Sequence, residues 1–189
     1  MIGKIFITRH GYDPQLGKHV KDPYLGPIPT FGACRPDFRK QLHEGDHIFV
    51  ISGKVKGANQ YVMGGFEVDR KISAFQAYDE YPNLRLKKLS NGELTGNIIV
   101  DGAGMQHPLD DHRTFESRIT NYIIGRNLLA IESDEEIELG RKDTLPVLSD
   151  ILKKKGNSPI EVVGRWGSEV GEKEIGKLRE WLASLKVTH

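Results

Sequence analysis

The sequence predicts an α+β fold in which a small, strongly curved, mostly antiparallel sheet is combined with separate helices. Two observations lead to this expectation. Strand-like segments dominate the first two thirds of the chain and are joined by short turns. Helical periodicity is confined to separate stretches, so the regular alternation of strands and helices typical of a parallel sheet is missing. Curving the sheet toward a barrel would protect its edges.

The first half supplies a strand, a long loop, a helix and two more strands. Residues 4–8 alternate in polarity and are rich in Ile and Phe, which is typical of a strand. Residues 9–32 show no periodicity and contain four prolines, so a long loop is expected, and such loops are often functional. Residues 35–42 form a short helix with Pro36 in its first turn. Strands at 47–52 and 61–72 follow.

The second half is expected to contain helices around further short strands. Ser73 is placed to cap a helix over 74–81, which Pro82 ends. Residues 85–89 and 96–100 make a hairpin around Asn91-Gly92. Strands are predicted at 118–124 and 127–131, on either side of a glycine turn. A helix begins at Asp143 or Thr144, and a last helix covers about 172–186 with an apolar stripe that includes Trp181.

Length and composition favour one domain, residues 1–189, with a C-terminal helical portion from about 142. No apolar run is long enough to cross a bilayer and no signal-peptide pattern is present, so a cytoplasmic protein is expected. The single cysteine, Cys34, excludes an internal disulfide and a multi-cysteine zinc site. The net charge of +1 conceals an early basic group that could attract phosphate: Lys18, Lys21, Arg35, Arg39, Lys40, Lys54, Lys56, Arg70 and Lys71.

Two segments resemble a known family. The stretch Phe31-Gly32-Ala33-Cys34-Arg35-Pro36 and the later Glu44-Gly45-Asp46-His47-Ile48-Phe49-Val50 are similar to nucleotide-modification-associated domains of bacteria and phages. Arg35 and His47 stand where that pattern usually has lysine and tryptophan, and a second cysteine of the pattern is missing. The Gly-Asp strand start also resembles the wider PUA-like superfamily, which includes EVE, ASCH and YTH domains. The resemblance covers roughly residues 1–82 and implies a pseudo-barrel whose pocket receives a modified or flipped base.

A base-binding site needs a flat surface for stacking, polar groups that meet the base edge and cations for phosphate. Phe31 and Tyr61 are candidates for stacking, and Ser52 for the base edge. Arg35 and Lys54 are candidates for phosphate contacts. The predicted base-binding set, which also includes residues at the mouth of the expected barrel and in the glycine-cysteine stretch, is Arg9, His10, Phe31, Cys34, Arg35, Ser52, Lys54 and Tyr61.

Other interpretations stay open beside this one. Cys34 has no histidine in an identifiable relation to it, so a buried thiol is preferred to a nucleophile. His107, Asp111 and His112 could bind a metal that activates water, although Pro108 and the spacing match no zinc signature. A C-terminal helix that docks a protein partner is the third interpretation.

The preferred hypothesis is therefore a non-catalytic module, without cofactor or resident metal, that binds nucleic acid carrying a modified base, with DNA favoured. The alternative is a metal-assisted hydrolase acting on a nucleotide or modified base.

Overall fold

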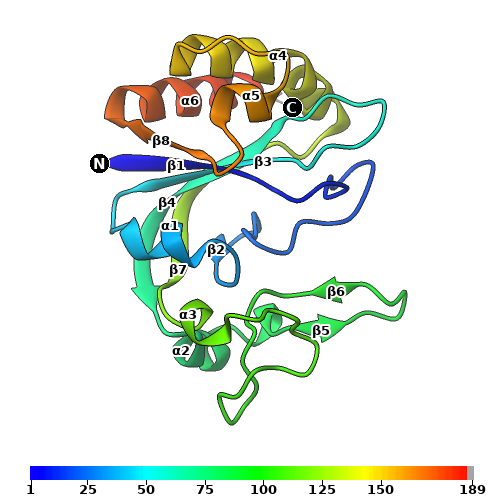
Figure 1. The fold of residues 1–189 in the computed structure, drawn as a ribbon, viewed down its shortest axis with the longest axis vertical. Coiled ribbons are helices and arrows are strands. Elements are labelled where there is room, and N and C mark those ends of the chain that lie inside the picture. The colour runs from blue at the N-terminus through cyan, green and yellow to red at the C-terminus, as the bar shows by residue number, and fades with distance from the viewer. Residues whose placement is uncertain (187–189) are drawn as a thin grey trace. The chain divides into compact units, whose positions relative to one another are not determined.

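The computed structural model describes residues 1–186 and divides into two compact units (Figure 1). Unit 1 contains residues 1–20, 45–67 and 127–186, and unit 2 contains residues 21–44 and 68–126. Helices and strands occur in both units, which confirms the predicted α+β class. The prediction that residues 1–189 form a single domain with a helical C-terminal portion stays a prediction.

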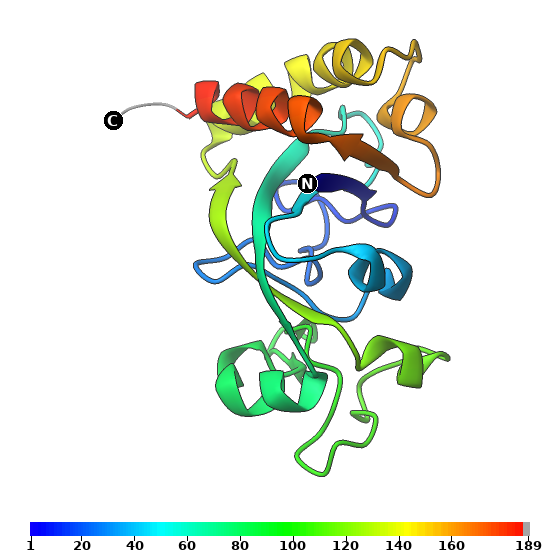
Figure 2. The same ribbon diagram turned by 90° about the vertical axis from the view of Figure 1, so that its left-hand side faces the viewer.

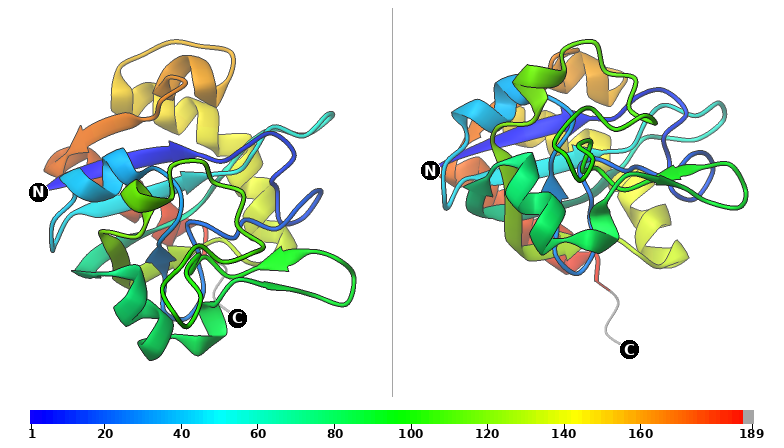
Figure 3. Two further views of the ribbon diagram at one scale, coloured as in Figure 1. Left: turned by 60° about the horizontal axis from the view of Figure 1, so that its bottom comes forward. Right: turned by 90° about the horizontal axis from the view of Figure 1, so that it is seen from below.

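A six-stranded mixed sheet has the order β2-β7-β4-β3-β1-β8. In unit 1, β1 (Ile2–Ile7) runs parallel to β3 (His47–Ile51), as Figure 3 shows, with Gly3 opposite His47 and Ile7 opposite Ile51. On its other side β1 pairs antiparallel with β8 (Ser168–Gly171), and β3 pairs antiparallel with β4 (Val62–Ile72). The expected antiparallel pairs are therefore present, and the β1–β3 pair makes the sheet mixed.

Three helices cover one face of the unit 1 strands (Figure 2). These are α4 (Asp134–Leu152), α5 (Pro159–Val163) and α6 (Glu172–Ser184). The predicted apolar stripe of the last helix is confirmed, because Ile175, Leu178 and Leu182 are buried. Within residues 1–186, no helix combines the length and the apolar composition that crossing a membrane requires.

Helix α4 begins earlier than the predicted start at residue 143 or 144. Ser133 caps it through a capping box: its Oγ accepts from the N–H of Glu136, and its own N–H donates to the Glu136 carboxylate. Such reciprocal bonds satisfy the free N–H groups of a first turn. Thr144 lies inside the helix, where its Oγ1 accepts from Val62 N at 2.9 Å. The predicted helix start at residue 143 or 144 is therefore wrong, because both residues lie inside a helix that Ser133 caps.

Unit 2 is built from short elements. The capping box of Ser73 on α2 (Ala74–Glu80) is present as predicted, and Pro36 occupies the first turn of α1 (Pro36–Gln41). The predicted hairpin over 85–100 is reduced to β5 (Lys87–Lys88) and β6 (Leu94–Thr95). The remaining elements are β2 (Thr30–Phe31), the 3₁₀ helix η1 (Pro82–Leu84) and α3 (Phe115–Arg118).

The prediction of two strands around a glycine turn is wrong for residues 118–131. A single strand, β7 (Tyr122–Ala130), runs through Gly125. The N–H of Gly125 donates to Pro29 O at 2.8 Å, so this glycine lies where another backbone segment approaches closely. Asn127 has a left-handed φ of 52°, an irregularity that strands accommodate at bulges. The glycine alone could not distinguish a turn from a continuous strand.

Candidate functional site

Unit 1 contains a polar pocket of about 750 Å³, a volume within the range of small-molecule sites. Three segments form it: the loop after β1, the turn between β3 and β4, and the first half of α4. The lining residues, called here the unit 1 pocket, are Gln15, Leu16, Gly57, Ala58, Asn59, Asp134, Glu138, Arg141 and Lys142. The first two segments belong to the long loop predicted over 9–32 and to the connection between the strands predicted at 47–52 and 61–72, whereas the contribution of α4 was missed.

The sequence of α4 places its charged residues on the pocket side. Asp134, Glu138, Arg141 and Lys142 are spaced so that they share one face of a helix. The Ser133 capping box fixes where the helix begins and therefore which residues face the pocket. Because the predicted helix began only at residue 143, this face could not be recognised.

Arg141 holds the three segments together. Its side chain is only 7% exposed; Nη1 donates to Asn59 O at 2.6 Å and Nη2 to Gln15 Oε1 at 3.1 Å. Nη2 also donates to Asp13 Oδ1 at 3.1 Å, and Asp13 is itself buried, so the two charges neutralise each other. The guanidinium lies 4.6 Å from the ring centroid of Tyr61. This buried arginine therefore fixes the positions of the three segments that line the pocket.

The remaining charged groups of the pocket face solvent. Asp134 Oδ1 accepts from Gln15 Nε2 at 2.9 Å, and Glu138 Oε1 lies 4.0 Å from Arg141 Nε. Both carboxylates and Lys142 are exposed. Since Asp13 already balances Arg141, the exposed lining presents two carboxylates and one ammonium group to a ligand.

Three of the predicted binding residues lie together on unit 1. The segment 8–12 packs on the end of β3: Gly11 N donates to Lys54 O at 2.9 Å, and Gly53 N donates to Tyr12 O at 2.6 Å. A Cβ at Gly53 would lie 1.9 Å from Arg9 O, so only glycine permits this approach. Arg9, His10 and Lys54 are exposed there. We call Arg9, His10, Lys54 and Lys56 the basic rim; Lys56 immediately precedes the pocket residue Gly57.

The other two predicted residues of unit 1 are buried, which corrects their expected roles. Ser52 is 0% exposed and Tyr61 1% exposed, and the Oγ of Ser52 accepts from Tyr61 N at 3.1 Å. Burial, together with the negative charge of Asp13, raises the pKa of Tyr61 to about 12. Ser52 therefore braces the backbone between β3 and β4, and Tyr61 supports Arg141 instead of stacking on a base.

Phe31, Cys34 and Arg35 belong to unit 2. Phe31 is 0% exposed in β2, so its ring is a core group and not a stacking platform. Arg35 lies 3.5 Å from the ring centroid of Phe38 and donates from Nη2 to Asp37 Oδ2 at 2.6 Å. Hydrogen bonding from Arg35 lowers the pKa of Asp37. The charge of Arg35 is thus matched locally, while Cys34 is half-buried.

A polar network that sequence patterns did not predict surrounds Asp22 in unit 2. The Asp22 carboxylate accepts backbone N–H groups from Gly32 at 2.7 Å, Ala33 at 2.9 Å and Cys34. Asn97 donates to the same carboxylate at 2.8 Å and accepts from Tyr122 Oη at 2.6 Å. Asn97 and Tyr122 are far from Asp22 in the sequence, and no local pattern connects them to it.

Arg39, counted among the basic residues in the sequence, is also buried in unit 2. It donates to four backbone carbonyls, at distances from 2.8 to 3.0 Å: those of Cys34, Arg118, Thr120 and Asn121. Burial lowers its pKa, and the nearby charge of Asp22 opposes that effect. Arg39 therefore fastens the loop after β2 to the segment before β7 and does not contribute to a basic surface.

The predicted metal ligands are only partly brought together in unit 2. Ligand atoms of Asp110, Asp111 and His112 lie within 4.8 Å of one another. His107 is not in this group, and its Nδ1 accepts from Leu109 N at 3.1 Å. Asp110 is already engaged, by His112 Nδ1 at 2.5 Å and by Gln106 Nε2 at 2.8 Å. Asp111 and the second nitrogen of His112 are then the groups best placed to bind a metal.

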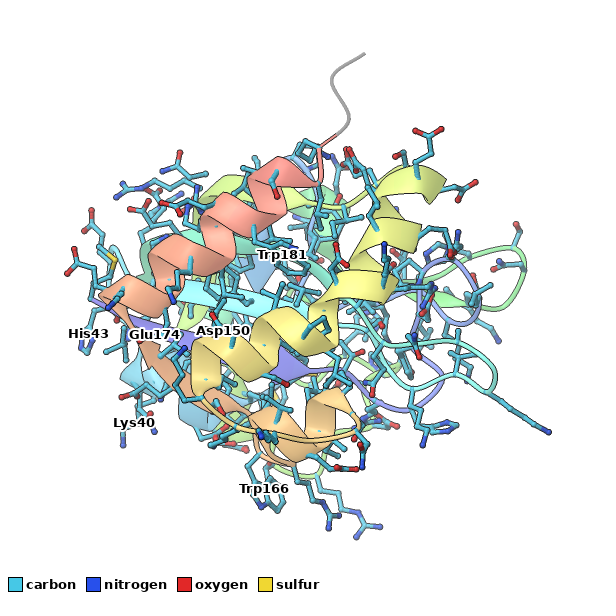
Figure 4. The ribbon with its side chains drawn as sticks, turned by 90° about the horizontal axis from the view of Figure 1, so that it is seen from above. Lys40, His43, Asp150, Trp166, Glu174 and Trp181 are labelled. Carbon is cyan, nitrogen blue, oxygen red and sulfur yellow. The ribbon has the colours of Figure 1, made fainter. Side chains whose placement is uncertain are left out.

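A second pocket, of about 590 Å³, lies between α4 and α6 in unit 1. Asp150 and Trp181, both labelled in Figure 4, belong to its lining, and Trp181 Nε1 is buried without a hydrogen-bond partner among residues 1–186. Pro146, Val147 and Ile151 contribute apolar surface. This groove is where the predicted protein partner of the C-terminal helix would bind, and that interaction stays a prediction.

Comparison of the chain with models of known families, with curated proteins and with solved structures gives no match.

Proposed function

We propose that this chain is a non-catalytic, PUA-like module that binds nucleic acid and receives a modified base in the unit 1 pocket. The observation that carries the proposal is a pocket large enough for a base that lies beside Lys56 of the exposed basic rim, within one unit. Lys56 and the pocket residue Gly57 are neighbours in the turn closed by Val55 and Ala58. Cations beside a pocket are the arrangement that a base reader needs for phosphate.

The rigidity of the pocket also supports this proposal. Arg141 fixes the loop at Gln15 and the turn at Asn59 against α4, so the pocket exists before ligand arrives. Preformed sites lose less conformational entropy on binding. The resemblance of residues 1–82 to nucleotide-modification-associated domains points in the same direction.

Fluorescence anisotropy with short oligonucleotides tests the proposal. The panel carries plain, methylated, hydroxymethylated and glucosylated bases in single and double strands. We expect one modification to bind most tightly, with affinity that falls as salt rises. The double variant Lys54→Ala, Lys56→Ala should weaken every complex, whereas Arg35→Ala should not, because Asp37 already engages Arg35. Absence of binding to the whole panel at low salt would contradict the proposal.

A metal-assisted hydrolase is a second candidate, favoured by the grouping of Asp111 and His112. If His112 Nδ1–H donates to Asp110, its Nε2 is oriented toward a metal, as in many carboxylate–histidine–metal arrangements. Few protein ligands would leave positions open for water, which catalytic metal sites require. Stoichiometric zinc in the purified protein, lost in Asp111→Ala, His112→Ala but retained in His107→Ala, would support it. Equal metal content in all these proteins would reject it.

A further inference from the structure

The charge of the unit 1 pocket bears on which modification it accepts, and this step rests on the proposed function. Arg141, the buried cation at its base, is already neutralised by Asp13. The exposed lining then holds Asp134 and Glu138 against Lys142 alone. An anionic substituent placed here would face two carboxylates, and like charges at close range are unfavourable.

Hydrogen-bond acceptors are in excess in the same place. Among the described residues, the one ion pair of Glu138 is its 4.0 Å contact with Arg141 Nε. Asp13 Oδ2 accepts no hydrogen bond although Arg141 Nη2 is 3.0 Å away, and Asp13 is 1% exposed. The backbone N–H of Gln15 and Nη2 of Arg141 donate to the other Asp13 oxygen, and both residues line the pocket. Asp13 is buried and does not line the pocket, so the acceptors that a ligand can reach are the exposed carboxylates of Asp134 and Glu138.

The spacing of the two carboxylates adds to this argument. Asp134 and Glu138 are four residues apart on α4, so they are neighbours on one helix face, where like charges destabilise a helix. Gln15 donates to Asp134 and Glu138 has a 4.0 Å contact with Arg141, so the two carboxylates outnumber the one exposed cation of the lining, Lys142. We infer that the unit 1 pocket selects base substituents that carry hydrogen-bond donors and no negative charge, namely amine or hydroxyl groups.

A series of oligonucleotides that differ only at one pyrimidine position tests this inference. The substituents are hydrogen, methyl, hydroxymethyl, aminomethyl and carboxyl, and binding is measured by competition. We expect the hydroxymethyl or aminomethyl oligonucleotide, or both, to bind about tenfold more tightly than the methyl one, as expected for hydrogen bonds to charged groups. The carboxyl oligonucleotide should bind no more tightly than the plain one. Comparison of the hydroxymethyl and aminomethyl oligonucleotides shows whether a hydroxyl or an amine is preferred.

Variants of one exposed side chain sharpen the result. Glu138→Gln should reduce the preference for the donor substituents, and Glu138→Lys should shift preference toward carboxyl. The matched control is Glu135→Gln, an exposed glutamate of α4 outside the pocket lining, and it should change nothing.

The outcomes separate this inference from the proposed function. Equal binding of all five substituents, or tightest binding of the carboxyl one, would overturn the inference and leave nucleic-acid binding intact. A preference for donors that persists in Glu138→Lys would overturn the assignment to this pocket. No binding to any oligonucleotide would overturn the proposed function itself.

Discussion

The Asp22 network of unit 2 and the unit 1 pocket both contain carboxylates, but the carboxylate of Asp22 is buried and hydrogen-bonded, whereas those of the pocket face solvent. Asp22 accepts from three backbone N–H groups and one amide, all within unit 2. In the pocket, Asp134 accepts from Gln15, while Glu138 has only a long contact with Arg141. The first carboxylate is 8% exposed; the other two are solvent-exposed.

This difference teaches that polar clusters should be judged by how many of their hydrogen bonds are already made. A carboxylate buried among its own backbone donors organises a loop, and removing it leaves those donors unsatisfied. A carboxylate that faces solvent contributes little to stability and remains available to a ligand. Substitutions in the Asp22 network should therefore lower stability, whereas substitutions of exposed pocket residues should alter ligand binding.

The largest expected effect is on stability, from Asp22→Ala. The change strips the partners from the N–H groups of Gly32 and Ala33 and from Asn97. We expect a loss of about 3–5 kcal/mol in the free energy of unfolding, the range for breaking a buried charged network. Urea unfolding followed by circular dichroism measures it, and hydrogen exchange at the amides of residues 32–34 localises it. The matched control Asp134→Ala should stay within about 0.5 kcal/mol of wild type. Equal stability of the two variants would refute the comparison.

Arg141→Lys should affect both stability and ligand binding, because Arg141 is a buried, hydrogen-bonded residue that also lines the pocket. A lysine cannot reproduce donation to Asn59 O, Asp13 and Gln15 together. We expect a loss of about 2–3 kcal/mol in stability, the sum of weakened bonds to a charged group, together with lower affinity for every oligonucleotide. Tryptophan fluorescence during urea unfolding follows this loss, since Trp166 and Trp181 both belong to unit 1. Unchanged unfolding would show that the arginine does not fix the pocket.

A pH-dependent effect of intermediate size is expected at Glu136. Burial alone would raise its pKa, but hydrogen bonds from Glu132 N and Ser133 N and the ammonium group of Lys186 lower its pKa to about 2. The folded-state pKa lies below the ordinary value of 4.5, so this stabilisation is complete above pH 4.5 and is lost as pH falls toward 2. Melting temperatures of wild type and Glu136→Gln should differ at pH 6 and converge near pH 2. A constant difference across that range would contradict the assignment.

The smallest effect on stability is expected from the basic rim. Lys54→Ala and Lys56→Ala remove exposed side chains and should change the free energy of unfolding by less than about 0.5 kcal/mol. Each should nevertheless lower the slope of log affinity against log salt by about 1 if it meets a phosphate. Anisotropy at several salt concentrations measures that slope. A variant of the basic rim that unfolds more easily but binds normally would contradict the assignment of these lysines to ligand binding.

Local patterns predicted the elements whose signals are local. The capping of α2 by Ser73 and the strands β1, β3 and β4 follow from short motifs and alternation, and the structure contains them. Gly125 was misinterpreted because a glycine in a strand and a glycine in a turn have the same sequence signal. The contact that decides between them is made by Pro29, which is remote in sequence.

The site was predictable only in part, for the same reason. Exposed positions in loops, such as Arg9 and Lys54, could be anticipated from their place after strands. Burial of Phe31, Ser52 and Tyr61 depends on partners elsewhere in the chain, so aromatic or hydroxyl character alone misassigned them. Asp13 and Arg141 pair across more than half the chain, and no spacing rule connects them.

The close approach at Gly53 has a consequence for protein engineering. The carbonyl of Arg9 occupies the space that any side chain at position 53 would need. The basic rim is therefore formed by two chain segments packed against each other, and neither segment would keep this conformation alone. A peptide copied from residues 8–12 or from residues 51–56 would not reproduce the surface, and a graft onto another scaffold would have to transfer both pieces with the glycine between them.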